Sequence, residues 1–150
     1  MCYLTQKVQW SKVLLAGLLY AVVNMVIQQV SAVLTMGYYL DPQYSSVWSK
    51  LMMPKAGPPP VNFFILAFIL DLIGGIILAL FYNFIKGLFK ESFWHKVWGF
   101  TEISSILLLV LFFFSLYLMI NLPLLLLLVW YISSVIIIFI SAMIFAKLIK

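Results

Sequence analysis

The stretch that decides the fold is NFFILAFILDLIGGIILALFYNFIK, residues 62–86. It is apolar for about 24 residues, which is long enough to cross the hydrocarbon core of a bilayer as one helix. Asp71 lies roughly 14 Å along this helix, because each residue adds ~1.5 Å. The sequence therefore predicts a membrane-spanning helix with a carboxyl group near its middle, where a charge is costly.

Small and polar residues recur at every fourth position on one face of this helix: Ala67, Asp71, Gly75, Ala79 and Asn83. Small side chains allow the backbones of two membrane helices to approach closely. We therefore predict close helix packing through the small residues of this span and of an earlier apolar stretch, namely Gly17, Ala21, Ala67, Gly74, Gly75 and Ala79.

The composition of the chain is that of a membrane protein. Of its 150 residues, 66% are hydrophobic and only 9% are charged, against about 25% charged in soluble domains. Nine lysines and four acidic residues give a net charge of +5. The lysines flank apolar stretches, a pattern that indicates membrane orientation and not binding of nucleic acid.

We predict an all-α integral membrane protein with four transmembrane helices in an antiparallel bundle, forming a single domain over residues 1–150. The spans are expected at about 13–35, 62–85, 97–120 and 124–146. Seven lysines lie at the two termini and in the 86–96 loop, and two lie in the 36–60 loop. The excess of positive charge on cytoplasmic loops then places the protein in the cell membrane with both termini cytoplasmic. A cleaved signal peptide is the alternative for the first span, although Asn24, Gln28 and Gln29 interrupt its apolar run.

The loop between the first two spans carries the signs of a second kind of helix. Asp41-Pro42 is a typical helix start. The apolar side chains that follow have helical spacing: Tyr44, Val47, Trp48, Leu51 and Met52. We predict a short amphipathic helix over about 42–53 that lies at the membrane surface. The interfacial anchors are Tyr44, Trp48, Trp94 and Trp98. Alternatively, the aromatic residues of this loop, Tyr38 and Tyr39 included, gate a groove or bind a partner.

The first span has a polar stripe of its own: Tyr20, Asn24, Gln28, Ser31 and Thr35. We expect the first two spans to be neighbours, with Asn24 and Gln28 facing Asp71 at a similar depth. Since no lysine lies at that depth, Asp71 must be protonated, hydrogen-bonded or in contact with water. Two hypotheses stay open for it: a proton or cation site, and a neutral carboxyl that holds two helices together.

The remaining candidates carry less chemistry. We group Asp71, Asn24, Gln28 and Glu102 as a possible intramembrane polar or ion site. Glu102 lies nearer the membrane surface and is expected to pair with Lys96, Lys86 or His95, or else to relay protons to Asp71. One histidine and one cysteine are too few for a catalytic triad or a metal site. We therefore predict no enzyme activity, no metal and no cofactor. Cys2 is a hypothetical acylation site.

The sequence leaves two functional hypotheses. The first is a small multi-pass membrane protein that acts by helix packing, as a homo-oligomer or as a subunit of a membrane assembly. The second is a small channel or a proton- or cation-coupled carrier that uses the Asp71 carboxyl. Both make the lipid bilayer and another membrane protein the expected partners.

Overall fold

The computed structural model describes residues 8–55 and 57–149, and these residues contain helices and no β-strand. Four long helices are apolar enough to cross a membrane: Trp10–Leu34, Val61–Leu88, Phe93–Met119 and Leu124–Leu148. The predicted all-helical fold, with four helices long and apolar enough to cross a membrane, is confirmed. Cys2 and its possible acylation lie outside the described residues.

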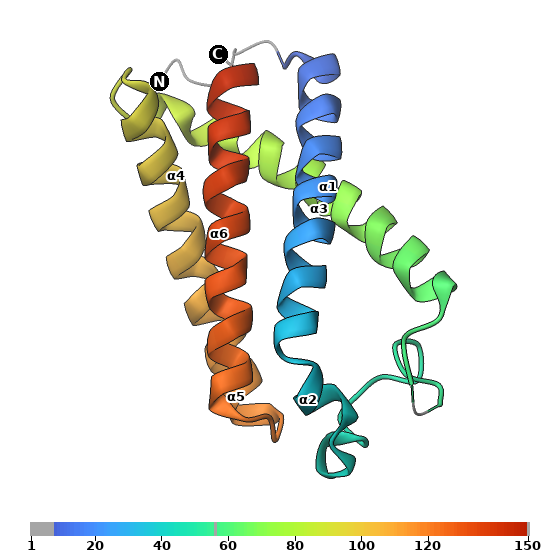
Figure 1. The fold of residues 1–150 in the computed structure, drawn as a ribbon. Coiled ribbons are helices and arrows are strands. Elements are labelled where there is room, and N and C mark those ends of the chain that lie inside the picture. Colours follow the sequence, from blue (N-terminus) through green and yellow to red (C-terminus); the bar gives the residue numbers. More distant parts are fainter. Residues whose placement is uncertain (1–7, 56, 150) are drawn as a thin grey trace.

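The regular elements follow the chain in a simple order (Figure 1). They are α1 (Trp10–Leu34), α2 (Met36–Leu40), the 3-10 turn η1 (Pro42–Tyr44), α3 (Val61–Ile85), the 3-10 turn η2 (Lys86–Leu88), α4 (Phe93–Leu108), the π-helical turn η3 (Leu109–Phe113), α5 (Phe114–Met119) and α6 (Leu124–Leu148). Because α4, η3 and α5 are continuous, they form the third span. It begins at Phe93, four residues before the predicted start.

The helices are arranged with α1 between α3 and α6, while α4 packs on the other side of α6. The most extensive contact is between α1 and α3, which confirms that the first two spans are neighbours. Figure 1 shows α3 crossing obliquely behind the other helices. We call the end of the bundle where α1 begins and α6 ends the terminal end, and the opposite end the loop end.

The main core lies at the terminal end, where α3 crosses the bundle. Its largest side chains are Tyr82, Phe100 and Phe145, each fully buried, with ring centroids 5.3–5.9 Å apart. The same core contains three small buried residues, Ala16, Ala79 and Ala142. A second and smaller core at the loop end joins the start of α6 to the outer loop through Leu122, Leu126, Leu127, Tyr38, Val47, Trp48 and Trp130.

The predicted amphipathic helix over 42–53 is wrong. Asp41 does cap a helical turn, since its side chain accepts a hydrogen bond from the Gln43 backbone at 2.9 Å, but that turn ends at Tyr44. Ser45 and Ser49 then bond to nearby backbone groups, at 2.8 and 3.1 Å, and such bonds compete with helix formation. The apolar side chains are instead used in the second core, so the segment folds as irregular turns over the end of the bundle.

One short helix differs from the prediction. The first span ends at Leu34, and after a break at Thr35 the helix α2 occupies residues predicted as loop. The α6 helix has Pro123 at its N-cap and uses no side-chain cap.

Candidate functional site

The crossing of α1 and α3 is built on two glycines. A Cβ added at Gly75 would stand 2.7 Å from the Gly17 carbonyl oxygen and 2.8 Å from the Tyr20 ring. A Cβ added at Gly17 would stand 2.9 Å from the Ile76 backbone nitrogen. The two backbones therefore touch at this point, as small residues allow, and the crossing is closed to water.

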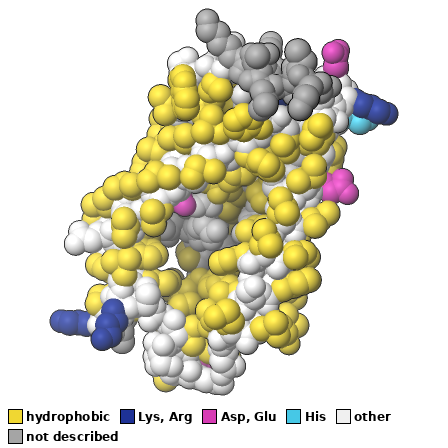
Figure 2. Space-filling model, turned by 180° about the vertical axis from the view of Figure 1, so that it is seen from behind, with side chains coloured by type: hydrophobic (Ala, Val, Ile, Leu, Met, Phe, Trp, Pro, Cys, Tyr) yellow, Lys and Arg dark blue, Asp and Glu magenta, His cyan; other side chains and the backbone are white. Residues whose placement is uncertain are grey.

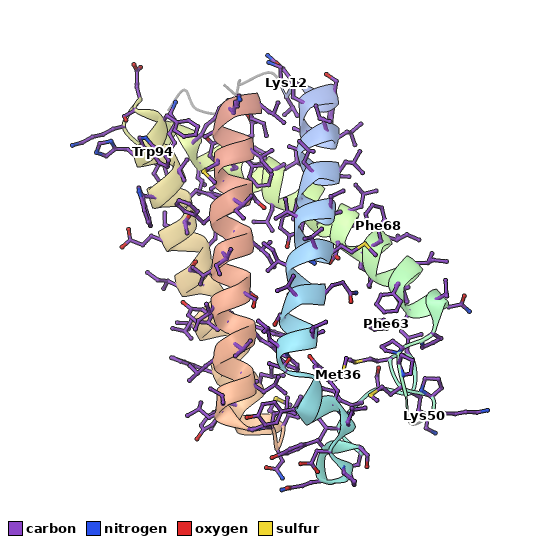
Figure 3. All side chains as sticks on the ribbon, in the orientation of Figure 1. Lys12, Met36, Lys50, Phe63, Phe68 and Trp94 are labelled. Carbon is purple, nitrogen blue, oxygen red and sulfur yellow. The ribbon has the colours of Figure 1, made fainter. Side chains whose placement is uncertain are left out.

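From this crossing, α1 and α3 diverge toward the loop end and leave a cleft between them. Its volume is about 620 Å³. Figure 2 shows the molecule hollowed on this face, and Figure 3 labels Met36, Phe63 and Phe68, which line its walls. The walls are largely apolar and hold four of the seven methionines of the chain, Met25, Met36, Met52 and Met53. Methionine and phenylalanine give a surface that adapts to apolar ligands of different shape.

Polar groups gather at the deep end of the cleft, near the helix crossing. Asp71 of α3 and Asn24, Gln28 and Gln29 of α1 all line it. The Asn24 amide is the polar side chain that interacts with the Asp71 carboxyl. The described residues that line the cleft include no lysine and no histidine. The deep end of the apolar cleft thus contains one carboxyl group, which can accept hydrogen bonds, and three side-chain amides.

The outer loop closes the other end of the cleft. Met52, Met53, Gly57, Pro58 and Pro59 line this end. Gly57 has a φ of 137°, a backbone conformation that is open to glycine and strained for other residues.

An aromatic group holds this loop against α6. The Trp130 indole nitrogen donates a hydrogen bond of 3.0 Å to the Tyr39 hydroxyl. The Trp48 ring lies 4.7 Å from the Tyr39 ring and 6.3 Å from the Trp130 ring. Burial raises the pKa of the Tyr39 phenol above its ordinary value of 10.0. Tyr39 and Trp130 also line the cleft, so the contacts that hold the loop against α6 form part of the cleft wall.

The structure brings together three of the four residues grouped as the polar site. Asp71, Asn24 and Gln28 share the cleft, whereas Glu102 lies in a separate groove between α4 and α6. The expected ion pair of Glu102 is not present: among the described residues this exposed carboxyl has no partner. The spacing of polar residues on α4 and α3 could not show that α6 would stand between the two carboxyls.

Only some of the residues proposed for helix packing lie in contacts between helices. Gly17, Ala21, Gly75 and Ala79 are buried in helix contacts. Ala67 lines the cleft instead. A Cβ at Gly74 would meet no atom within 4 Å, so its assignment to helix packing is not supported in this chain.

The four aromatic anchors also have different surroundings. Trp94 and Trp98 are exposed on the outside of the bundle, where an interfacial role is possible. Trp48 packs against protein, and Tyr44 packs edge-on against Tyr38 with ring centroids 6.4 Å apart.

No family model, curated protein or solved structure matches this chain. The chemistry of the cleft must therefore be argued from its residues. Among the described residues, no group of three or more histidine, cysteine, aspartate or glutamate side chains is placed to hold a metal ion. A carboxyl beside amides can accept a hydrogen bond or balance a positive charge.

Sequence reasoning missed two features of this site. Trp130 was not identified as a site residue, because only the folded outer loop brings it beside Tyr39. The methionines were a usable signal, since Met52 and Met53 are adjacent and lie within the loop that closes the cleft.

Proposed function

We propose that this is a small multi-pass protein of the cell membrane that binds an amphiphilic molecule in the cleft between α1 and α3. The ligand has an apolar body and one compact hydrogen-bond donor, an amine or a hydroxyl. The observation that carries the proposal is the place of Asp71: it lines an open apolar cleft and is not enclosed in a dry contact between two helices.

The size of the cleft suits a small ligand. A volume of about 620 Å³ falls within the ~300–1,000 Å³ typical of small-molecule sites. One long-chain amphiphile is a suitable occupant of such a cleft.

The chemistry at the deep end supports a ligand with a donor group. Asn24 lines the cleft together with Asp71, and none of the described residues that line it carries a positive charge. An ammonium or hydroxyl group from a ligand would supply the missing donor. A hydrogen bond to a charged group contributes about 1.5–3 kcal/mol, which is enough to select such a ligand over a plain hydrocarbon.

The shape of the cleft gives less support to a channel. On the terminal side of Asp71, the Gly17–Gly75 crossing leaves no room for an added Cβ. Beyond it lies the core of Tyr82, Phe100 and Phe145. A channel or carrier would need this crossing to open, so the proton- or cation-coupled carrier remains the weaker alternative.

The distribution of lysine supports an orientation for the site. Among the described residues, five lysines lie at the terminal end, namely Lys12, Lys86, Lys90, Lys96 and Lys147, and two lie in the outer loop, Lys50 and Lys55. We therefore place the terminal end in the cytoplasm. The cleft then opens in the outer half of the bilayer and can be reached from the lipid.

Quenching of tryptophan fluorescence would test the proposal, because Trp130 lines the cleft. The protein is reconstituted in phosphatidylcholine vesicles and titrated with brominated C18 amine, alcohol and alkane, since bromine quenches nearby indoles. We expect saturable quenching by the amine and the alcohol, and only gradual, unsaturated quenching by the alkane.

Two variants sharpen the test. Asp71→Asn should lose the preference for the amine while the fold persists, because the amide keeps the shape of the side chain. Glu102→Gln is the matched control, since this carboxyl lies outside the cleft, and it should behave as the unmodified protein does. Equal quenching by all three probes, unchanged in Asp71→Asn, would refute the proposed function.

A further inference from the structure

A second feature of the surface is a carboxyl group on an otherwise apolar face of α4 and α6. Glu102 lines an open groove of about 460 Å³ between these helices, together with Trp98, Ser105, Tyr131 and Ile132. It lies six residues, or roughly 9 Å, beyond Lys96 on the same helix, and thus nearer the membrane surface than Asp71. This depth is within the part of α4 that is long and apolar enough to cross a membrane.

The surroundings of Glu102 are strongly apolar. The side chains exposed around it include Trp98 at 60%, Ile106 at 53% and Ile132 at 56%. Such a face suits contact with lipid tails, but a carboxyl does not, and acidic residues in spanning helices usually face protein or water. The face therefore has one group that lipid cannot satisfy.

The neighbouring hydroxyl groups do not supply a partner. The Thr101 hydroxyl donates to the Val97 carbonyl at 2.8 Å, and the Tyr131 hydroxyl donates to the Ser105 carbonyl at 3.4 Å. Within residues 8–55 and 57–149, Glu102 forms no ion pair and no hydrogen bond. The buried Ser105 hydroxyl in the same groove is also without a partner there.

We propose that this groove is the docking surface for a membrane-spanning helix of a different protein that carries one basic side chain at the depth of Glu102. The charge is the argument for this occupant, because a lysine or arginine on the partner would neutralise the carboxyl and remove it from lipid. Trp98 would stack against the same cation from one side.

A second copy of this chain is the less suitable occupant. Its lysines lie in loops and at the ends of the spans, as Lys12, Lys96 and Lys147 do. None of the described lysines lies at the depth of Glu102 in the middle part of a helix. A homo-oligomer would therefore bring a second unpaired carboxyl to the interface without a matching base.

This site is independent of the cleft described above. Asp71 and Glu102 line different cavities, and α6 stands between α1 and α4. The two proposals can therefore fail separately.

A designed peptide provides a direct test. The probe is a 23-residue leucine–alanine helix with one lysine placed about six residues from its end, at the level of Glu102, and a second peptide has leucine in place of the lysine. Binding is measured by energy transfer in phosphatidylcholine vesicles, to full-length protein labelled at Ser92→Cys with Cys2→Ser. We expect the lysine peptide to bind about tenfold more tightly than the leucine peptide.

The controls separate the two carboxyls. Glu102→Gln should abolish the advantage of the lysine peptide, while Glu91→Gln, in the exposed loop before α4, and Asp71→Asn should retain it. Circular dichroism verifies that each variant is folded. Equal binding of both peptides to the unmodified protein would overturn the proposal. So would Glu102-dependent self-association of the labelled protein in the absence of peptide, since a second copy would then occupy the face.

Discussion

The substitution Gly75→Ala tests whether the close crossing of α1 and α3 holds the bundle together. The new Cβ would stand 2.7 Å from the Gly17 carbonyl oxygen and 2.8–2.9 Å from two atoms of the Tyr20 side chain. Ordinary contacts of this kind begin near 3.4 Å. The two helices would therefore have to separate by roughly 0.7 Å at the crossing, which packed side chains resist.

The magnitude follows from two opposing effects. Extra volume in a packed contact costs about 1–3 kcal/mol, while glycine to alanine in a helix gains up to ~1 kcal/mol. Gly74 provides a matched control, because it is the adjacent residue of the same helix and its added Cβ would meet nothing within 4 Å. Since the gain in helix propensity is common to both, Gly75→Ala should be about 1–3 kcal/mol less stable than Gly74→Ala.

The assay is reversible unfolding by sodium dodecyl sulfate in mixed micelles, followed by circular dichroism and tryptophan fluorescence. Gly17→Ala serves as a second test of the same contact from α1, since its Cβ would stand 2.9 Å from the Ile76 backbone nitrogen. We expect it to resemble Gly75→Ala. If Gly75→Ala proves as stable as Gly74→Ala, the crossing is not a close backbone contact and the reasoning fails.

Three further predictions concern the outer loop and the orientation of the chain. Trp130→Phe should lower the free energy of unfolding by about 0.5–1.5 kcal/mol, because it removes the hydrogen bond to Tyr39; the same unfolding titration measures this, and no change would mean that the bond is not stabilising. Burial raises the Tyr39 pKa above 10.0, so its contribution to stability is complete below the unfolded-state pKa and is lost as pH rises through the folded-state pKa. Stability should therefore fall less steeply above pH 10 in Tyr39→Phe than in the unmodified protein. An impermeant thiol reagent added outside cells should label Ser46→Cys and not Ser92→Cys, each made with Cys2→Ser; the reverse pattern would place the termini outside.

The sequence was sufficient to predict the four long helices and the pairing of the first two. Length and hydropathy determine the spans. The polar stripe through Asn24 and Gln28 is costly in contact with lipid, so it is expected to face protein, and Asp71 is the polar group at a similar depth on the next span. Gly17 and Gly75, which the sequence analysis grouped as packing residues, lie at the crossing of α1 and α3. These features depend on spacing within one helix, which is visible in the sequence.

Other features depend on how helices are placed relative to one another. Helical spacing predicted a helix over 42–53. In the structure, Val47 and Trp48 pack in the second core, and Ser45 and Ser49 form hydrogen bonds with nearby backbone groups, so no continuous helix forms there. The divergence of α1 and α3 at Asp71 could not be predicted from the sequence, because the tilt of α3 depends on its contacts with other helices. The cleft therefore became visible only in the folded chain.

The oblique path of α3 has a consequence for the lipid around it. Its apolar part, residues 63–85, is about 35 Å long, so a hydrocarbon core ~30 Å thick accommodates it at a tilt of roughly 30°, and one of ~27 Å at roughly 40°. The arm from Gly75 to the start of α3 is about 21 Å long, so this change in tilt would move the helix start by about 3–4 Å. We therefore expect the width of the cleft mouth, and with it the access of a ligand to Asp71, to change with bilayer thickness.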